Sequence, residues 1–203
     1  MPFLLKVFFR GSAGYWETRY AKGGTSGKGS YKQYAQFKSQ VINSFVADNA
    51  VTSVIEYGCG DGNQLTLCKY PKYLGFDVSP TAINRCKEIF RGDTTKSFKL
   101  TGEYANETAE LTLSLDVIYH LVEDNVFENY LRRLFDSSEK FVIIYSSDCG
   151  ENPLVQKPHV RHRKFTGWIE KNLPAWKLIK HIPNACESSG PLSVDFFIYR
   201  ANI

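Results

Sequence analysis

The stretch Val54-Ile55-Glu56-Tyr57-Gly58-Cys59-Gly60-Asp61-Gly62 decides the fold. A short apolar strand that ends in glycines at alternate positions is typical of the first strand and ligand-binding turn of a doubly wound α/β sheet. Glycine lets the backbone turn tightly and approach a ligand closely. We therefore predict that a ligand binds just beyond the end of this strand.

Strand and helix patterns alternate on both sides of this turn. Apolar runs predict strands at residues 53–57, 73–78, 97–101, 111–118, 141–146, 176–182 and 193–199. Helical spacing, with Ser79 as an N-cap before Pro80, predicts helices at residues 31–48, 63–68, 80–90, 123–135 and 165–173. The last two strands have no helix between them. The predicted fold is thus a Rossmann-like α/β fold: a seven-stranded, mostly parallel sheet with an antiparallel C-terminal strand and helices on both faces.

Length and composition are those of one ordinary globular domain. The chain has 203 residues, is 43% hydrophobic and carries a net charge of +4. We divide it into an N-terminal segment, residues 1–50, and a core, residues 51–203. The first ten residues are expected to be an edge segment or a linker remnant from a longer polypeptide.

Several classes of partner and location are disfavoured by the same composition. The basic residues form no broad face, so we expect no nucleic-acid partner. No apolar run is long enough to span a bilayer, so we expect no membrane partner. The five cysteines are an odd number without CxxC spacing, which argues against a disulfide framework and a zinc site. These features predict a soluble protein of the cytoplasm.

The segment before the first predicted helix, residues 11–31, mixes glycine with aromatic residues. So many glycines predict a mobile loop rather than a stable helix. A flexible linker is the alternative to a lid over the binding site. We favour the lid, because linkers seldom contain tryptophan and tyrosine so densely.

Acidic residues near the glycine turn indicate which ligand it holds. Glu56 precedes the first glycine, and Asp77 ends the second strand, where a carboxylate can hold two ribose hydroxyls. A helix cap is the alternative role for Asp77. An NAD site would have a glycine where this chain has Asn63, and an acidic turn would repel a pyrophosphate. S-adenosylmethionine (SAM) carries an amino-acid tail and a sulfonium, so an acidic turn suits it better. The helix predicted after the turn offers free N–H groups to the carboxylate of that tail.

An acid followed by x-Gly-x-Gly-x-Gly, with a second acid at the end of strand two, resembles the signature of the class I SAM-dependent methyltransferases. The resemblance covers residues 51 to the end. It implies that the methionine part of SAM contacts Glu56, Tyr57, Gly58 and Gly60. It also implies that Asp77 holds the ribose, that Val78 packs on the adenine, and that Leu115 and Asp116 flank the methionine and the transferred methyl group.

Residues 16–31, 113–121 and 159–165 resemble a narrower group, small methyltransferase domains found beside or fused to glycosyltransferases. The group includes domains of multidomain glycosyltransferases from large DNA viruses of algae, which decorate a terminal rhamnose. This resemblance implies a glycan acceptor and glycosyltransferase domains in the same polypeptide. It also implies a host-cell cytoplasmic location, and SAM contacts from Tyr15, Arg19, Gly24 and Ser30. Arg19 is placed to pair with the SAM carboxylate.

A sugar hydroxyl needs a base to make it a good nucleophile. His120 is our first candidate, oriented by Asp116 if the intervening residues form a helix. The alternative is that His120 only packs against the strand end or caps a helix. His159 and His162 are the other candidate bases. Arg161 and Arg163 beside them bind acceptor hydroxyls or a diphosphate, or else belong to a solvated basic loop.

Other functions remain open at this point. Asp116, His120 and Asp148 are possible metal ligands, but their spacing does not demand a metal and we predict none. Methylation of a small non-sugar metabolite and SAM binding without catalysis are the alternatives to glycan O-methylation. An NAD-dependent reductase is disfavoured by Asn63 and by the lack of a Tyr-x-x-x-Lys pair.

Overall fold

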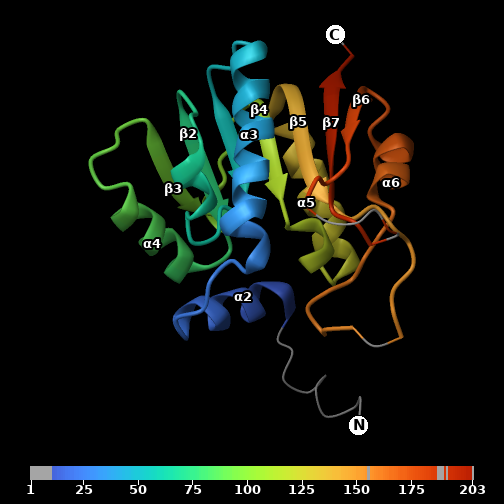
Figure 1. Cartoon of the computed structure of the whole chain (residues 1–203), viewed down its shortest axis with the longest axis horizontal. Helices are drawn as coiled ribbons and strands as arrows, with labels where there is room; N and C mark the ends of the chain where they lie inside the picture. The colour runs from blue at the N-terminus through green and yellow to red at the C-terminus, as the bar shows by residue number, and fades with distance from the viewer. Residues whose placement is uncertain (1–10, 155, 187–189, 191, 203) are drawn as a thin grey trace.

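A seven-stranded sheet forms the centre of the molecule in the computed structural model, which describes residues 11–154, 156–186, 190 and 192–202 (Figure 1). The strand order is β3-β2-β1-β4-β5-β7-β6. The strands are β1 (Val54–Tyr57), β2 (Tyr73–Asp77), β3 (Lys96–Leu100), β4 (Ala109–Leu115), β5 (Ser138–Ser146), β6 (Trp176–Ile182) and β7 (Asp195–Ala201). β1 to β5 pair in parallel, and β7 lies antiparallel between β5 and β6. The predicted fold class is confirmed.

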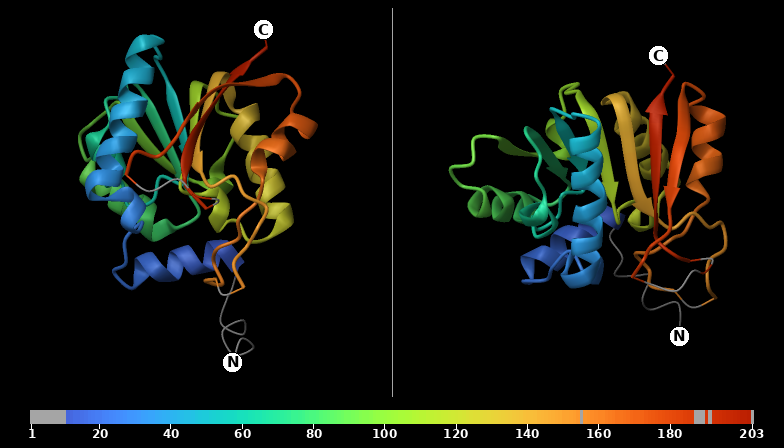
Figure 2. Two further views of the ribbon diagram at one scale, coloured as in Figure 1. Left: turned by 45° about the vertical axis from the view of Figure 1, so that its right-hand side comes forward. Right: turned by 45° about the horizontal axis from the view of Figure 1, so that its top comes forward.

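In the described part of the chain, five α-helices and four short 3-10 helices surround the sheet. The α-helices are α2 (Gly11–Ala21), α3 (Lys32–Asp48), α4 (Pro80–Ile89), α5 (Asp124–Asp136) and α6 (Phe165–Asn172). The 3-10 helices are η1 (Lys28–Ser30), η2 (Gln64–Leu67), η3 (Thr101–Glu103) and η4 (Ile118–His120). α3 and α4 pack on one sheet face, and α5 and α6 pack on the other (Figures 1 and 2).

Two apolar layers hold these helices to the sheet. Ile42 of α3 and Ile83 of α4 pack with Leu111 and Leu113 of β4 in one layer. The other layer joins α5 and α6 to the opposite sheet face. β1 is buried along its whole length, as expected for a central parallel strand covered on both faces. The apolar layers therefore fix the strand ends, and with them the turns that follow β1, β2 and β4.

Local sequence explains where α4 begins. Ser79 accepts a hydrogen bond from the backbone N–H of Ala82, and Pro80 occupies the first turn. A serine cap followed by proline is a favoured helix start, because the proline lacks the N–H that would go unpaired there. The predicted cap and start of this helix are confirmed.

Several element bounds differ from the prediction, and two of the differences affect the site. β4 ends at Leu115, three residues before the predicted end, because Asp116 adopts a positive φ of 61° that takes the chain out of the strand. The predicted helix at residues 63–68 is the single 3-10 turn η2. One turn aligns few peptide dipoles, so the helix N-terminus that we expected to attract a carboxylate is not formed here.

The prediction of a loop throughout residues 11–31 is wrong for its first half. Gly11–Ala21 forms the helix α2, which crosses beneath the carboxyl ends of the parallel strands (Figure 1). Ser12 and Tyr20 are buried, and tertiary contacts of this kind override the low helix propensity of glycine. The glycine-rich residues that follow form a turn and η1.

The expectation for the first ten residues lies outside the described part of the chain. Within the described residues, no helix is long and apolar enough to cross a membrane.

Candidate active site

A cavity of about 280 Å³ lies at the carboxyl ends of β1, β2 and β4, and residues of α2 and η1 also line it. Ligands of doubly wound sheets bind at this edge. Ten of the predicted site residues line the cavity: Ser30, Glu56, Tyr57, Gly58, Gly60, Asp77, Val78, Leu115, Asp116 and His120. The fold thus gathers residues from four separate stretches of the sequence into one site.

Five predicted site residues do not line this cavity: Tyr15, Arg19, Gly24, His159 and His162. The Arg19 guanidinium donates to the carbonyl of Thr25 at 2.6 Å and lies 5.5 Å from the centre of the Trp16 ring. Arg19 therefore shapes the loop after α2, and its position does not support the expected pairing with the SAM carboxylate. Gly24 accepts a hydrogen bond from Arg85 through its carbonyl, outside the cavity.

The glycine turn is held by Asp77 at the end of the neighbouring strand. The backbone N–H of Gly60 donates to the Asp77 carboxylate at 2.9 Å, and the N–H of Ser79 donates to its other oxygen, also at 2.9 Å. Burial raises the pKa of Asp77 to about 6, and these backbone donors counteract that rise. Asp77 thus joins the turn after β1 to the turn after β2 and still faces the cavity.

Glu56 is buried in the wall of the cavity. It accepts a hydrogen bond from the Tyr73 hydroxyl at 2.7 Å. Burial raises the pKa of Glu56 to about 7, although the Tyr73 hydroxyl and the nearby charge of Lys38 favour its ionised form. A positive group in the cavity would stabilise the carboxylate further.

The segment after α2 is bound to the glycine turn through Asp61. One Asp61 oxygen accepts hydrogen bonds from the Ser26 N–H and the Tyr31 hydroxyl, each at 2.8 Å. The Asp61 N–H donates in return to Ser26 Oγ at 3.0 Å. Residues 22–31, which we call the lid loop, therefore cover the turn that the sequence predicted as the cofactor site.

Hydrogen bonds to α4 and to its N-cap residue also hold α2 in place. Glu17 accepts hydrogen bonds from the Ser79 hydroxyl at 2.5 Å and the Thr81 hydroxyl at 2.7 Å. Arg85 donates to the carbonyls of Tyr20 and Gly24. These contacts hold α2 across the cavity in the described conformation.

We expect Gly60→Ala to weaken cofactor binding by displacing the lid loop. Gly60 has a φ of +59°, and a Cβ there would lie 2.3 Å from Ser26 Oγ and 3.0 Å from the Tyr20 hydroxyl. Ser26 would have to give up its contact with Asp61. The measurement is calorimetric affinity for SAM together with limited proteolysis after lysines 22 and 28.

Gly102→Ala is the matched control for that variant, because nothing lies within 4 Å of a Cβ at Gly102. Unchanged affinity and unchanged cleavage in Gly60→Ala would show that the lid loop does not depend on this close approach.

His120 lies on η4 at the rim of the cavity, in edge contact with Trp16 at 4.9 Å between ring centres. Its Nδ1 is 2.9 Å from the carbonyl oxygen of His159. A carbonyl can only accept, so Nδ1 carries the hydrogen and Nε2 is the unprotonated nitrogen of the neutral ring. Burial lowers the pKa of His120, which keeps the ring neutral near pH 7. His120 is thus prepared to accept a proton at Nε2.

Asp116 does not orient His120 through a hydrogen bond, although its charge favours the protonated form of the ring. η4 is a short 3-10 turn, which does not place residues four apart on one face. One Asp116 oxygen accepts from the Tyr119 hydroxyl at 2.8 Å, and the other accepts from Lys38 Nζ at 2.5 Å. The backbone carbonyl of His159 orients His120 in its place.

His159 and His162 contribute to the framework around His120. The His159 ring stacks on Tyr15, with 3.9 Å between ring centres, and burial lowers its pKa to about 4. His162 Nδ1 is 2.7 Å from the Ser147 hydroxyl. Neither ring lines the cavity, so His120 is the histidine of the three predicted bases that faces it.

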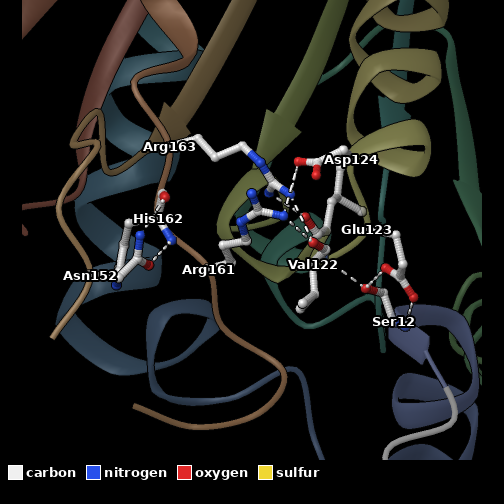
Figure 3. Close-up of polar contacts among 9 residues, drawn as sticks. Ser12, Val122, Glu123, Asp124, Asn152, Arg161, His162 and Arg163 are labelled. Carbon is white, nitrogen blue, oxygen red and sulfur yellow. Dashed lines mark hydrogen bonds and ion pairs between the residues drawn. The ribbon is translucent and has the colours of Figure 1, made fainter. Parts of the chain in front are cut away.

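The basic loop after β5 is attached to the start of α5 (Figure 3). Arg161 and Arg163 both pair with Asp124, at 2.9 and 3.0 Å, and both donate to the carbonyl of Val122. Glu123 accepts two hydrogen bonds from Ser12 of α2. The expectation that the two arginines bind an acceptor is not supported, because these contacts occupy them in joining the loop to α5.

Several residues of the cavity wall were missed by sequence analysis, among them the polar side chains of Lys38 and Gln64. Lys38 lies on α3, outside any motif, among residues whose apolar spacing marks a helix face packed on the sheet. A lysine on that buried face was the available signal. Gln64 Oε1 is buried without a hydrogen-bond partner, while its Nε2 donates to the Ala35 carbonyl at 3.0 Å.

Asp148, the third residue considered as a metal ligand, lies at the start of α6. It accepts hydrogen bonds from the N–H and the hydroxyl of Thr166, at 3.0 and 2.6 Å. In the described part of the chain, no three His, Cys, Asp or Glu residues gather in an arrangement that could hold a metal ion.

The chain was compared with known proteins. No family model matches it, and no curated protein gives a significant match. Solved structures do match. The N-methyltransferase NodS from Bradyrhizobium japonicum, in complex with S-adenosylhomocysteine (SAH), superposes with a TM-score of 0.71 at 15% identity, covering 94% of this chain and 98% of NodS.

Two further structures agree with this match. The methyltransferase domain of bacterial CtHen1 has a TM-score of 0.67 at 16% identity, covering 83% of this chain and 98% of that domain. Magnesium protoporphyrin IX methyltransferase from Synechocystis, with bound SAH, has a TM-score of 0.65 at 11% identity, covering 99% of this chain and 100% of the enzyme. The chain therefore has the fold of SAM-dependent methyltransferases.

Proposed function

We propose that this chain is a SAM-dependent O-methyltransferase whose acceptor is a hydroxyl group of a glycan, such as a terminal deoxyhexose like rhamnose. The observation that carries the proposal is the cavity at the ends of β1, β2 and β4. There Asp77, the glycine turn and a neutral His120 line the same cavity. The shared fold of methyltransferases solved with SAH supports the cofactor.

The residues present fit SAM. Asp77 offers carboxylate oxygens for ribose hydroxyls, Val78 supplies apolar surface for an adenine, and Leu115 lines the cavity next to Asp116 for the methionine part. The orphaned Gln64 Oε1 needs a donor, and the ammonium of an amino-acid tail is a suitable one. Glu56, whose carboxylate a positive group would stabilise, lies in the same wall. The cavity thus offers both apolar and charged groups, which suits a ligand with an aromatic base and a charged tail.

When bound, SAM supplies a methyl group on a positively charged sulfur. The protein's task is then to place the acceptor oxygen in line with that methyl group and to remove its proton. His120 Nε2 is the base for the second task, since its ring is neutral and Nδ1 is fixed by the His159 carbonyl. Trp16 and α2 cover the same side of the cavity, which limits the access of water.

A glycan acceptor is supported by the three stretches that resemble methyltransferases associated with glycosyltransferases. They lie in α2 with the lid loop, in β4 with η4, and in the loop after β5, all near His120. Glycosyltransferase domains in the same polypeptide are part of this proposal. A small non-sugar metabolite is the alternative acceptor.

Incubation with methyl-labelled SAM and a panel of rhamnosyl, xylosyl and fucosyl glycosides tests the acceptor. We expect label on a sugar hydroxyl, with transfer lost in Asp77→Asn. Transfer to amines or to non-sugar metabolites alone would contradict the glycan assignment. Tight SAM binding without transfer to any acceptor class would favour a non-catalytic SAM-binding domain.

We expect the affinity for SAM to rise as the pH is raised to about 7 and to level off above it. The pKa of Glu56 is about 7 in the free protein, and the positive charges of SAM favour the ionised carboxylate. Binding therefore lowers this pKa and releases a proton, so affinity increases with pH up to the pKa of the free protein. Calorimetry in buffers of different ionisation enthalpy measures the proton released.

Glu56→Gln should remove the rise between about pH 6 and 7 and leave a smaller rise at lower pH from Asp77, whose pKa is about 6. An unchanged pH profile in Glu56→Gln would show that Glu56 does not respond to the ligand.

A further inference from the structure

The amino-acid end of SAM carries a carboxylate. The sequence predicts two binding partners for it, and the structure supports neither. The helix expected after the glycine turn is the single 3-10 turn η2, and Arg19 does not line the cavity. An anion buried in a protein needs a positive or donating partner. Another residue must therefore supply the positive charge at that end of the site.

Among the described residues that line the cavity, the cationic side chains are Lys38 and Arg133, which come from helices on opposite faces of the sheet. Arg133, on α5, donates to the Thr101 carbonyl at 3.0 Å and covers the Tyr104 ring at 4.9 Å. Lys38, on α3, is close enough to Glu56 for its charge to lower the pKa of that carboxyl. Gln64 is near Lys38 as well, since it donates to the carbonyl of Ala35 on the same helix.

The polarity of the lining residues indicates how the cofactor binds. The base of SAM is uncharged and flat, which suits the apolar side chains of Val78 and Val126. The tail carries both an ammonium and a carboxylate, which suits the neighbourhood of Lys38, where Gln64 Oε1 lacks a donor and the lysine supplies a positive charge.

Lys38 has unused donor capacity. Its side chain is fully buried, and its Nζ donates to Asp116 at 2.5 Å. An ammonium has three hydrogens; within the described part of the chain, Nζ also lies 5.3 Å from the centre of the Tyr145 ring, and Asp116 is its one hydrogen-bond acceptor. Asp116 in turn is shared with Tyr119. Lys38 can therefore keep Asp116 and bind a second carboxylate through the cavity.

We propose that Lys38 binds the carboxylate of the SAM amino-acid tail and, through its ion pair, positions Asp116 beneath the lid loop. This inference rests on the proposed function and names the residue that recognises the cofactor tail. Lys38 thus connects the cofactor to the lid, because a Cβ at Gly29 of that loop would lie 2.7 Å from Asp116 Oδ2.

Calorimetry with two ligands separates this role from simple neutralisation of Asp116. SAM has the tail carboxylate, whereas decarboxylated SAM lacks it and keeps the amine and sulfonium. Removing Lys38 alone leaves Asp116 as an unpaired charge, which is costly. Lys38→Met is therefore measured both alone and in the Asp116→Asn background. Asparagine tolerates the positive φ of position 116.

We expect Lys38→Met/Asp116→Asn to bind SAM about 10- to 100-fold more weakly than Asp116→Asn does, which is the usual effect of losing a hydrogen bond to a charged group. Decarboxylated SAM should bind the two variants within about 3-fold of each other. The single Lys38→Met variant should likewise lose more affinity for SAM than for decarboxylated SAM. Lys87→Met, at an exposed position near the end of α4, should change the affinity for neither ligand.

Equal losses for both ligands, or no loss for either, would overturn the assignment of Lys38 while leaving SAM binding by the wild-type protein intact. Failure of the wild-type protein to bind either ligand would instead contradict the proposed function itself.

Discussion

Asp77→Asn is expected to bind SAM about 10²- to 10⁴-fold more weakly than the wild-type protein. Two hydrogen bonds from ribose hydroxyls to a carboxylate are worth about 3–6 kcal/mol together, since each bond to a charged group contributes about 1.5–3 kcal/mol. Asn retains one oxygen acceptor but loses the charge. Calorimetric titration with SAM and with SAH measures the loss for both ligands, because both carry the ribose.

Asp77 also accepts hydrogen bonds from the Gly60 and Ser79 N–H groups, so the fold must be monitored in parallel. Thermal unfolding serves for this, with Asp93 changed to Asn as the control, since Asp93 is half-buried, accepts a backbone hydrogen bond from Thr95 and does not line the cavity. A folded Asp77→Asn protein with unchanged affinity would exclude Asp77 from the ribose site and return it to the alternative role of a structural residue between β2 and α4.

His120→Ala is expected to reduce turnover by about 10²-fold or more while SAM affinity stays within a few-fold of wild type, because a general base contributes about 10²- to 10⁴-fold. The acid limb of the wild-type pH profile should lie below pH 6.5, the ordinary pKa of histidine, since burial lowers the pKa of His120. Turnover is measured with the acceptor that the glycoside panel identifies.

His159→Ala is the informative control for that variant. It removes the ring stacked on Tyr15 but keeps the backbone carbonyl that orients His120, so we expect a much smaller loss of turnover. Near wild-type turnover in His120→Ala, with a large loss in His159→Ala or His162→Ala, would transfer the role of base to one of those residues.

Much of the fold could be predicted from the sequence because the strands are central and buried. β1 and β5 consist largely of β-branched and aromatic residues, and α4 begins with a serine cap and a proline. The end of β4 could not be predicted, because Asp116 leaves the strand through a backbone conformation that few residues other than glycine adopt. α2 was missed for a different reason, since it is stabilised by contacts with α4 and α5 that lie far away in the sequence.

The candidate site likewise contains residues that the sequence predicts and residues that it does not. Glu56, Gly60 and Asp77 belong to a local motif, and the fold brings them together as that motif predicts. Lys38 and Gln64 have no motif, and their place in the cavity follows only from how α3 and η2 pack on the sheet. The partner of His120 is a backbone carbonyl, which leaves no mark in the sequence because every residue has one.

Titration of the wild-type protein with SAM, followed by competition with SAH and with NAD, determines whether the glycine turn and Asp77 form a SAM site. We expect one SAM site per chain, displaced by SAH and unaffected by NAD. Absence of SAM binding by the folded protein, or displacement of SAM by NAD, would contradict this expectation.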